Sequence, residues 1–410
     1  MGFQGSHSIR GALHSTGLLA MALVASCAVG GSDEPATQDK AAADAVINVL
    51  PYGKAKNVAP DTTVLVAAQG GALSAVTVRA GGGAAGRGTV MKGVLSADRT
   101  KWRSSRSMSP GTTYTVSATA TNPDGKQTKV ETAFTTVQST AAVGIKDITP
   151  QKGELVGVGM PIMITFDKEI TNRVDVERNL RVVTSKAIEG AWHWVDGKTV
   201  HFRPRDYWPS HTKVKLIGQL NGVEVDTGRY ATQDFTHEFK VGRSQMSVVN
   251  TDTHMMKVRR DGEVIKNFPI SAGRGGTWKY YTTNGKHVAM SMEPVVIMDS
   301  STVGCGPGCP GYYRQTVYSN VRISNSGEYV HGAPWSVGSQ GNSNVSHGCV
   351  NVGPENARWF MKNTLRGDPI DVVGSPRQLE PFNGWGQWQM SWHRWVKGSA
   401  VSLAFDTEKL

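Results

Sequence analysis

The chain carries one stretch in which glycine, serine and asparagine surround a cysteine and two histidines: His331-Gly-Ala-Pro-Trp-Ser-Val-Gly-Ser-Gln-Gly-Asn-Ser-Asn-Val-Ser-His-Gly-Cys-Val-Asn-Val352. Glycine lets a backbone approach a ligand closely and adopt angles that other residues avoid. Apolar runs flank the stretch, and a polar loop between such runs is where a scaffold commonly holds its chemistry. The stretch therefore predicts a site built around a cysteine.

Cys349 is the candidate nucleophile of this site. A thiolate attacks far better than a thiol, and a neighbouring imidazole can take the proton. His331 and His347 are the candidates for that base; on an extended strand His347 and Cys349 would point the same way, since they lie two residues apart. The residues alone leave two other interpretations open, an inert buried thiol at Cys349 and a structural histidine at His347.

Two blocks of the stretch resemble a known family. Ser346-His-Gly-Cys-Val-Asn351 resembles the signature of the L,D-transpeptidases with a YkuD-like catalytic fold, and His331-Gly-Ala-Pro-Trp335 resembles their second characteristic block. The resemblance covers roughly residues 245–373 and is specific because both blocks occur together. It points to the actinobacterial type, a lipoprotein in which two immunoglobulin-like domains precede the catalytic domain.

The resemblance implies a role for each residue of the site. Cys349 would be the nucleophile, and His331 would be the base and later the acid, oriented by the backbone carbonyl of Gly332. Many relatives carry serine at that last position, but a backbone acceptor needs no side chain, so the glycine is expected to cost little. The N–H groups of Gly348 and Cys349 and the hydroxyl of Tyr313 would bind the oxyanion.

A flap from Met290 to Tyr313 would cover the site, again by resemblance. The matching substrate-contacting positions are Met298, Tyr313, Ser326, Gly327, Trp335, His347 and Asn351.

The activity implied is peptidoglycan cross-linking and cell-wall biogenesis. Cys349 would attack the carbonyl of the third residue of a tetrapeptide stem, release the terminal D-Ala, and pass the acyl group to a second stem as a 3→3 cross-link, without cofactor or metal. Carbapenem β-lactams would acylate the same thiol. Two alternatives stay open: an L,D-carboxypeptidase of the same fold, where water replaces the amine, and a non-catalytic wall-binding lipoprotein, against which the intact pair of Cys349 and His331 argues.

Length and charge limit the classes of protein that fit. At 410 residues the chain is long enough for two to four domains. The net charge is +11, but lysine and arginine are scattered without a long basic run, which argues against a nucleic-acid surface. An anionic wall polymer or membrane lipid fits this charge, and so does a protein that is merely basic.

Three further cysteines need separate explanations. Cys305 and Cys309 lie in Cys-Gly-Pro-Gly-Cys, where an oxidising compartment favours a small disulfide; a free dithiol and a metal site are the alternatives, the last needing more ligands. Residues 1–27 read as an export signal ending in Val24-Ala-Ser-Cys27, which resembles a bacterial lipobox. Cys27 would then carry the lipid that anchors the protein to the outer face of the membrane; ordinary cleavage and secretion is the rival interpretation.

The rest of the chain predicts a mainly β protein. Residues 28–45 are small and polar and indicate a flexible tether reaching into the wall. Residues 46–138 and 139–244 each show short alternating runs separated by turn signals such as Asn122-Pro-Asp-Gly125, typical of two tandem immunoglobulin-like β-sandwiches acting as spacers. In the second, Trp192 and Trp194 suggest either glycan stacking or, preferably, burial.

Residues 245–373 predict the β-rich catalytic domain. Asp261-Gly262 signals a type I′ hairpin, and residues 355–365 show the spacing of a helix. The C-terminal extension, residues 374–410, places four tryptophans on one face of a helix expected from about Gln387 to Lys397. We expect that face to pack on the catalytic domain rather than to bind membranes or glycans, because four exposed indoles would favour aggregation.

Overall fold

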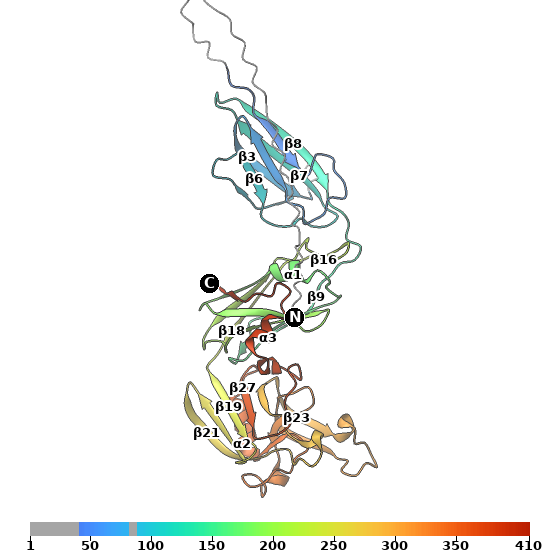
Figure 1. Ribbon diagram of the computed structural model, residues 1–410, viewed down its shortest axis with the longest axis vertical. Coiled ribbons are helices and arrows are strands. Elements are labelled where there is room, and N and C mark those ends of the chain that lie inside the picture. The colour runs from blue at the N-terminus through green and yellow to red at the C-terminus, as the bar shows by residue number, and fades with distance from the viewer. Residues whose placement is uncertain (1–40, 82–87) are drawn as a thin grey trace, which may run out of the picture. The chain divides into compact units, whose positions relative to one another are not determined.

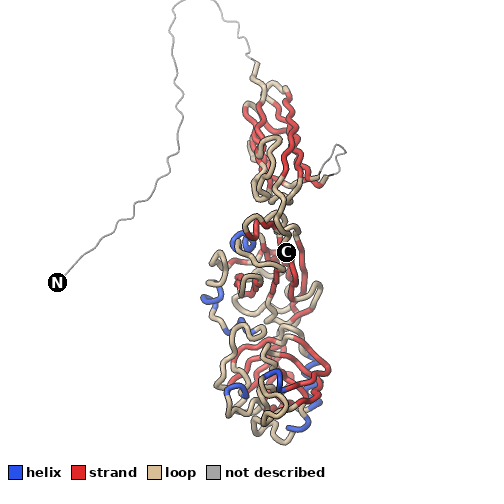
Figure 2. Tube along the Cα trace, turned by 90° about the vertical axis from the view of Figure 1, so that its right-hand side faces the viewer, coloured by secondary structure: helices blue, strands red, loops and turns tan. Residues whose placement is uncertain are grey.

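The computed structural model describes residues 41–81 and 88–410 (Figure 1). The predicted signal segment, the lipobox cysteine Cys27 and the tether up to residue 40 lie outside these residues. Strands dominate throughout, and the helices are short (Figure 2). Within the described residues no helix is long and apolar enough to cross a membrane. The predicted mainly β organisation, two sandwiches followed by a third β-rich domain, is confirmed.

The first sandwich consists of two four-stranded antiparallel sheets. Its first sheet has the order β1 (Val46–Leu50), β2 (Leu65–Gln69), β6 (Lys101–Ser104), β5 (Gly93–Leu95). Its second sheet has the order β4 (Thr89–Val90), β3 (Ala72–Ala80), β7 (Thr113–Thr121), β8 (Gln127–Thr135). Alternate residues of β7 are buried, as the period of a half-buried strand requires. Asn122-Pro-Asp-Gly125 forms the predicted turn between β7 and β8.

The second sandwich has two five-stranded sheets, each of which includes a strand from the end of the chain. One has the order β10 (Leu155–Val156), β18 (Phe235–Val241), β15 (Lys213–Gly218), β12 (Leu180–Thr184), β29 (Glu408–Lys409). The other has the order β28 (Phe405–Asp406), β13 (Glu189–Trp194), β14 (Thr199–Pro204), β11 (Ile162–Phe166), β9 (Ile145–Thr149). A helix, α1 (Arg173–Arg178), and a small hairpin of β16 (Glu224–Asp226) and β17 (Arg229–Tyr230) complete the domain. Trp192 and Trp194 are buried in its core, so the packing interpretation of these two residues is correct.

The predicted helix from Gln387 to Lys397 is wrong. The segment forms a 3₁₀ turn, η4 (Gly386–Gln389), and a separate helix, α3 (Trp392–Val396). Met390 between them is extended, and the side chain of Ser391 caps α3 by accepting a hydrogen bond from the N–H of Arg394. An N-capping serine inside the tryptophan repeat therefore ends one element and starts the next.

We expected the tail indoles to pack on the catalytic domain. They pack mainly on the second sandwich instead. The guanidinium of Arg203 on β14 lies 4.8 Å from the ring centroid of Trp388, 5.2 Å from that of Trp392 and 4.9 Å from that of Trp395. Trp395 is fully buried, and its indole N–H donates to the carbonyl of Ala191 on β13. A buried cation is stabilised by such aromatic faces, which is why this sandwich gathers the indoles.

The catalytic domain is built on a nine-stranded sheet. Its order is β22 (Gly285–Val288), β27 (Pro369–Val373), β19 (Gln245–Asn250), β20 (Met255–Arg260), β21 (Glu263–Ser271), β26 (Val350–Val352), β25 (Tyr329–Gly332), β24 (Arg314–Arg322), β23 (Ser291–Asp299). Asp261 and Gly262 both have positive φ, as the predicted type I′ turn between β20 and β21 requires. The predicted helix is α2 (Pro354–Asn363), which contacts β24 and β25 and buries Ala357 and Phe360.

Candidate active site

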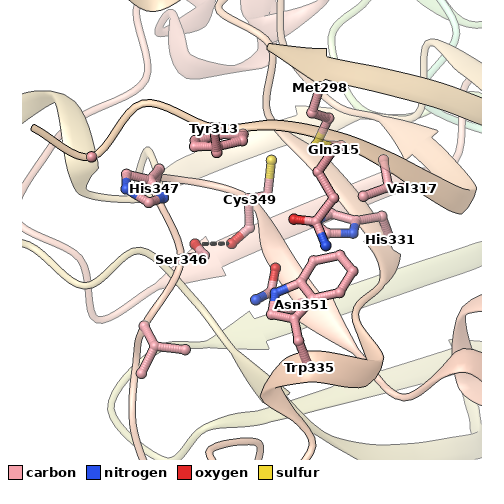
Figure 3. Close-up of a pocket in the computed structure, with 12 residues that line it drawn as sticks. Met298, Tyr313, Gln315, Val317, His331, Trp335, Ser346, His347, Cys349 and Asn351 are labelled. Carbon is pink, nitrogen blue, oxygen red and sulfur yellow. Dashed lines mark hydrogen bonds between the residues drawn. The ribbon is translucent and has the colours of Figure 1, made fainter. Parts of the chain in front are cut away.

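The two blocks of the opening stretch become neighbouring strands. β25 pairs with β26 in parallel, and His331 lies opposite Asn351 in the register. Opposite residues of paired strands share a face of the sheet, and residues two apart on one strand do as well. His331, Asn351 and Cys349 therefore face one cavity of about 270 Å³ (Figure 3).

His331 is held in the tautomer that a base needs. Its Nδ1–H donates to the carbonyl of Gly332, 3.1 Å away, so that Nε2 is left as the acceptor. The side chain is only 3% exposed. Burial lowers the pKa of the His331 imidazole to about 4, and hydrogen bonds to Gly332 and Asn351 oppose this only in part. The ring is thus neutral at pH 7 and can accept a proton.

Cys349 rests as a neutral thiol directed at a backbone carbonyl. Its Sγ lies 3.6 Å from the carbonyl oxygen of Gly327, a weak hydrogen bond. Burial raises the pKa of the Cys349 thiol to about 12; a backbone bond at Tyr329 opposes the shift and the Glu328 carboxylate adds to it. Attack therefore requires the thiol to leave the Gly327 carbonyl and transfer its proton to the neutral His331 ring.

The predicted oxyanion donors differ in their surroundings: the N–H of Gly348 is already hydrogen-bonded within the protein, whereas Tyr313 lines the cavity. Gly348 has a φ of +132°, which favours glycine, and its N–H donates to the hydroxyl of Ser346 at 3.1 Å. That hydroxyl in turn donates to the carbonyl of Cys349 at 2.6 Å (Figure 3). An oxyanion would have to displace Ser346 to use the Gly348 N–H. Tyr313 lines the cavity, and burial raises the pKa of its hydroxyl to about 12, so it stays a donor at neutral pH.

The predicted substrate-contacting residues divide into two groups. Met298, Tyr313, Trp335, His347 and Asn351 line the cavity. Ser326 and Gly327 belong instead to the turn before β25. The N–H of Ser326 donates to Asn383 of the tail, and Gly327 meets the site through its carbonyl alone.

Other residues of the cavity were not predicted. Gly311, Gln315, Val317, Val345 and Ser346 also line it. Gln315 and Val317 follow Tyr313 at intervals of two along β24, so strand alternation starting from Tyr313 would have found them.

A buried polar network behind the nucleophile had no signal in the sequence. The Glu328 carboxylate, 4% exposed, accepts hydrogen bonds from the N–H of Thr283 at 2.7 Å and from its hydroxyl at 2.6 Å. His287, fully buried, meets the carbonyl of Thr283 through Nε2 at 2.8 Å. A Cβ on Gly348 would lie 3.9 Å from this carboxylate, so the charge sits directly behind the nucleophile loop.

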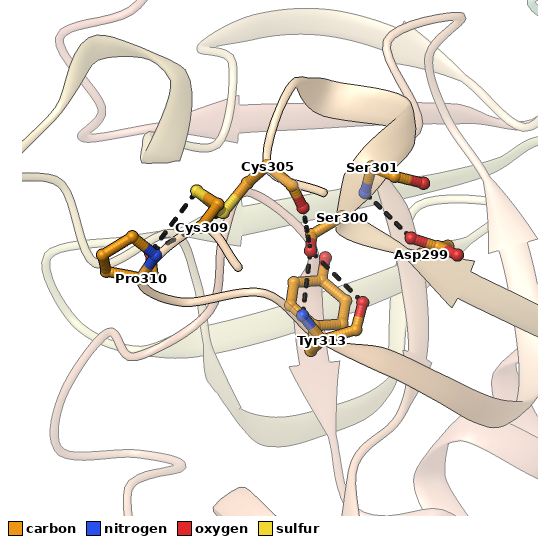
Figure 4. Close-up of a disulfide and its surroundings, with 7 residues drawn as sticks. All are labelled: Asp299, Ser300, Ser301, Cys305, Cys309, Pro310 and Tyr313. Atoms are coloured by element: carbon orange, nitrogen blue, oxygen red, sulfur yellow. Dashed lines mark hydrogen bonds between the residues drawn. A yellow bond between two sulfur atoms is a disulfide. The ribbon is translucent and has the colours of Figure 1, made fainter. Parts of the chain in front are cut away.

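The predicted flap, Met290 to Tyr313, consists of β23, the 3₁₀ turn η2 (Ser300–Val303) and the loop that leads to β24. Cys305 and Cys309 form a disulfide in that loop (Figure 4), the first of the three alternatives for this pair. Ser300 connects the loop to the cavity. Its hydroxyl donates to the carbonyl of Cys305 at 2.8 Å, and its N–H donates to the carbonyl of Tyr313 at 3.0 Å.

No group of three or more His, Cys, Asp or Glu side chains that could hold a metal ion gathers within residues 41–81 and 88–410. The donors around Cys349 are a thiol, two imidazoles, amides and hydroxyls. This set suits proton transfer and acyl transfer by the cysteine itself.

Comparisons with known proteins agree with this geometry. Residues 244–372 match the family model of the L,D-transpeptidase catalytic domain, and residues 55–224 match that of a bacterial Ig domain. The chain is 35% identical to L,D-transpeptidase 2 of Mycobacterium tuberculosis over 84% of its own length and 83% of the relative's. It is 36% identical to L,D-transpeptidase 5 of the same organism over 77% of its own length and 69% of the relative's. The solved structure of the L,D-transpeptidase LdtMt1 in complex with imipenem superposes with a TM-score of 0.50 at 37% identity, over 57% of this chain and all of that one.

Proposed function

Because this chain belongs to the L,D-transpeptidases, a family of acyltransferases acting on peptidoglycan, we propose that it forms 3→3 cross-links through a thioester on Cys349 and releases D-Ala from tetrapeptide stems. The observation that carries this proposal is the shared cavity of Cys349 and His331, in which Gly332 fixes the imidazole and the flap residues Met298, Gly311 and Tyr313 form part of the wall.

The proposed reaction has two acyl transfers. The Cys349 thiol gives its proton to His331 as sulfur bonds to the carbonyl carbon of the third stem residue. The tetrahedral oxyanion collapses, the C–N bond to D-Ala breaks, and His331 returns the proton to the leaving amine. The side-chain amine of a second stem then loses a proton to His331 and attacks the thioester, so that a new amide forms and the thiol is restored.

A purified stem tetrapeptide with mass spectrometry tests this function. The expected products are free D-Ala and a cross-linked dimer, and the Cys349→Ala variant should make neither. A tripeptide without dimer would instead identify the L,D-carboxypeptidase, in which water takes the place of the amine. Absence of all products from a folded wild-type protein would contradict the proposed function.

We further propose that carbapenems acylate Cys349, since a relative of the same fold has been solved in complex with imipenem. Opening of the strained lactam by sulfur forms an adduct with the full mass of the drug. Intact-protein and peptide mass spectrometry should place it on Cys349; an adduct elsewhere would contradict the site.

We also propose that the protein is a lipoprotein held at the outer face of the membrane through Cys27, with residues 28–45 and the two sandwiches extending the catalytic domain into the wall. The support is the sequence Val24-Ala-Ser-Cys27 and the polar segment that follows it. Cys27→Ala should move the protein from the membrane fraction to the soluble fraction. Unchanged retention would exclude the lipid anchor.

A further inference from the structure

A basic and aromatic cluster adjoins the cavity on the side of His347. It comprises Arg274, Lys279, Tyr280 and His347, with Lys279 and Tyr280 in the 3₁₀ turn η1 (Trp278–Tyr280). The guanidinium of Arg274 lies 4.6 Å from the Tyr280 ring centroid, and the Lys279 ammonium lies 5.3 Å from it. The rings of Tyr280 and His347 meet edge to face at 4.9 Å. We call these four residues the basic cluster.

The positive charge of the basic cluster is not compensated. Neither Arg274 nor Lys279 forms an ion pair with any carboxylate in the described part of the chain. Burial first, and then the charges of Arg274 and Lys279, lower the pKa of His347. Its Nε2 is buried and has no hydrogen-bond partner. A buried donor or acceptor without a partner is costly, and a ligand is one way to satisfy it.

The backbone holds the basic cluster against the nucleophile loop. The N–H of Arg274 donates to the carbonyl of Ser346 at 2.9 Å, and Gly273 bridges to Ser346 in parallel. The carbonyl of Gly348 accepts from the hydroxyl of Thr282 at 2.7 Å. Both ends of the segment from Arg274 to Thr282 are therefore fixed to residues that flank Cys349, and the two cations lie beside Tyr280 and His347.

We propose that Arg274, Lys279 and His347 form a subsite that binds a carboxylate of the substrate beside Cys349. A carboxylate there would supply the missing negative charge and accept a hydrogen bond from Nε2 of His347. That it is the terminal carboxylate of the donor stem peptide rests on the proposed function; the preference for an anion at this position does not.

Two alkylating reagents test the anion preference without peptidoglycan chemistry. Iodoacetate and iodoacetamide attack a thiol in the same way and differ only in a carboxylate against a neutral amide. The ratio of their rates at Cys349, followed by peptide mass spectrometry without reductant, cancels changes in the reactivity of the thiol itself. The ratio should fall about threefold in Arg274→Gln/Lys279→Gln at low ionic strength, and 0.5 M salt should remove most of the difference.

Matched variants separate a local subsite from general charge. Lys266 also places its ammonium over an aromatic ring, that of Trp359 at 5.5 Å, but it lies on β21 and, unlike Arg274 and Lys279, its charge does not lower the pKa of His347. Lys266→Gln should leave the ratio unchanged, and the charge-preserving swap Arg274→Lys/Lys279→Arg should stay within about 1.5-fold of wild type. An unchanged ratio in the double glutamine variant, or an equal fall in Lys266→Gln, would overturn the subsite.

A second comparison identifies the carboxylate. For the stem tetrapeptide with a free terminal carboxylate, kcat/KM should be about threefold lower in the double glutamine variant than in the wild type. For the same peptide with a terminal amide, kcat/KM should be the same in both proteins. Equal losses for both peptides would contradict the assignment to the terminal carboxylate. A wild-type protein inactive on both peptides but selective for iodoacetate would refute the proposed function and leave the anion subsite standing.

Discussion

The orientation of the His331 ring depends on the backbone carbonyl of Gly332, so His331 and Gly332 should respond differently to substitution. His331→Ala removes the base and should lower kcat/KM by about 10²- to 10⁴-fold. Gly332→Ser keeps the carbonyl, but its Cβ would lie 3.1 Å from the carbonyl oxygen of Tyr318, so a small backbone shift is needed. We expect a loss of no more than about threefold, measured by steady-state release of D-Ala. Similar losses in both variants would contradict the role of the backbone acceptor.

The buried neutral imidazole of His331 also links stability to pH. Its pKa is about 4 in the folded protein and near 6.5 in the unfolded chain. Between these values the unfolded state binds more protons, so the free energy of unfolding is greatest above pH 6.5 and falls as the pH decreases towards 4. Relative to His331→Gln, the wild type should lose up to about 3 kcal/mol across this range, measured by urea denaturation. Parallel curves for the two proteins would show that the histidine is not buried in its neutral form.

The flap connects the disulfide to Tyr313 through Ser300, and this connection should limit how fast the flap opens. A lid that opens less often admits its ligand more slowly. Cys305→Ser/Cys309→Ser loosens the loop and should therefore speed carbapenem acylation of Cys349 by about two- to fivefold without changing the mass of the adduct.

Stopped-flow fluorescence with and without a mild reductant measures this effect. The reductant should accelerate the wild type and leave the double serine variant unchanged, which serves as the control. Equal acylation rates for oxidised and reduced wild type would remove the link between the disulfide and flap opening, while leaving the role of Cys349 untouched.

The tail packs into the second sandwich, where β28 and β29 are edge strands of its two sheets. Trp395 is fully buried, stacks on His193 at 4.5 Å and donates to Ala191. Trp395→Ala should destabilise this sandwich by about 3–5 kcal/mol, seen as lost hydrogen-exchange protection in β13, β14 and β28. Trp278→Ala, at a position 61% exposed, is the matched control and should change stability by no more than about 0.5 kcal/mol. Full protection in Trp395→Ala would show that the tail is dispensable for the sandwich.

Local patterns in the amino-acid sequence were sufficient to predict much of the fold and the residues around the nucleophile. Alternation and turn residues predicted the tandem sandwiches and the Asp261-Gly262 hairpin, because strand period and turn geometry are local properties. The two blocks around His331 and Cys349 indicated the cavity, because both lie within one continuous stretch of the sequence.

Other features depend on contacts between distant segments and on burial. The resting position of the thiol on Gly327, the carboxylate of Glu328 behind the loop and the contact of Tyr280 with His347 all arise where segments far apart in sequence meet. The gathering of the indoles on both sides of Met390 around Arg203 is likewise a contact between segments far apart in sequence. The low pKa of His331 and the high pKa of Cys349 come from desolvation, which exists only once the chain has excluded water.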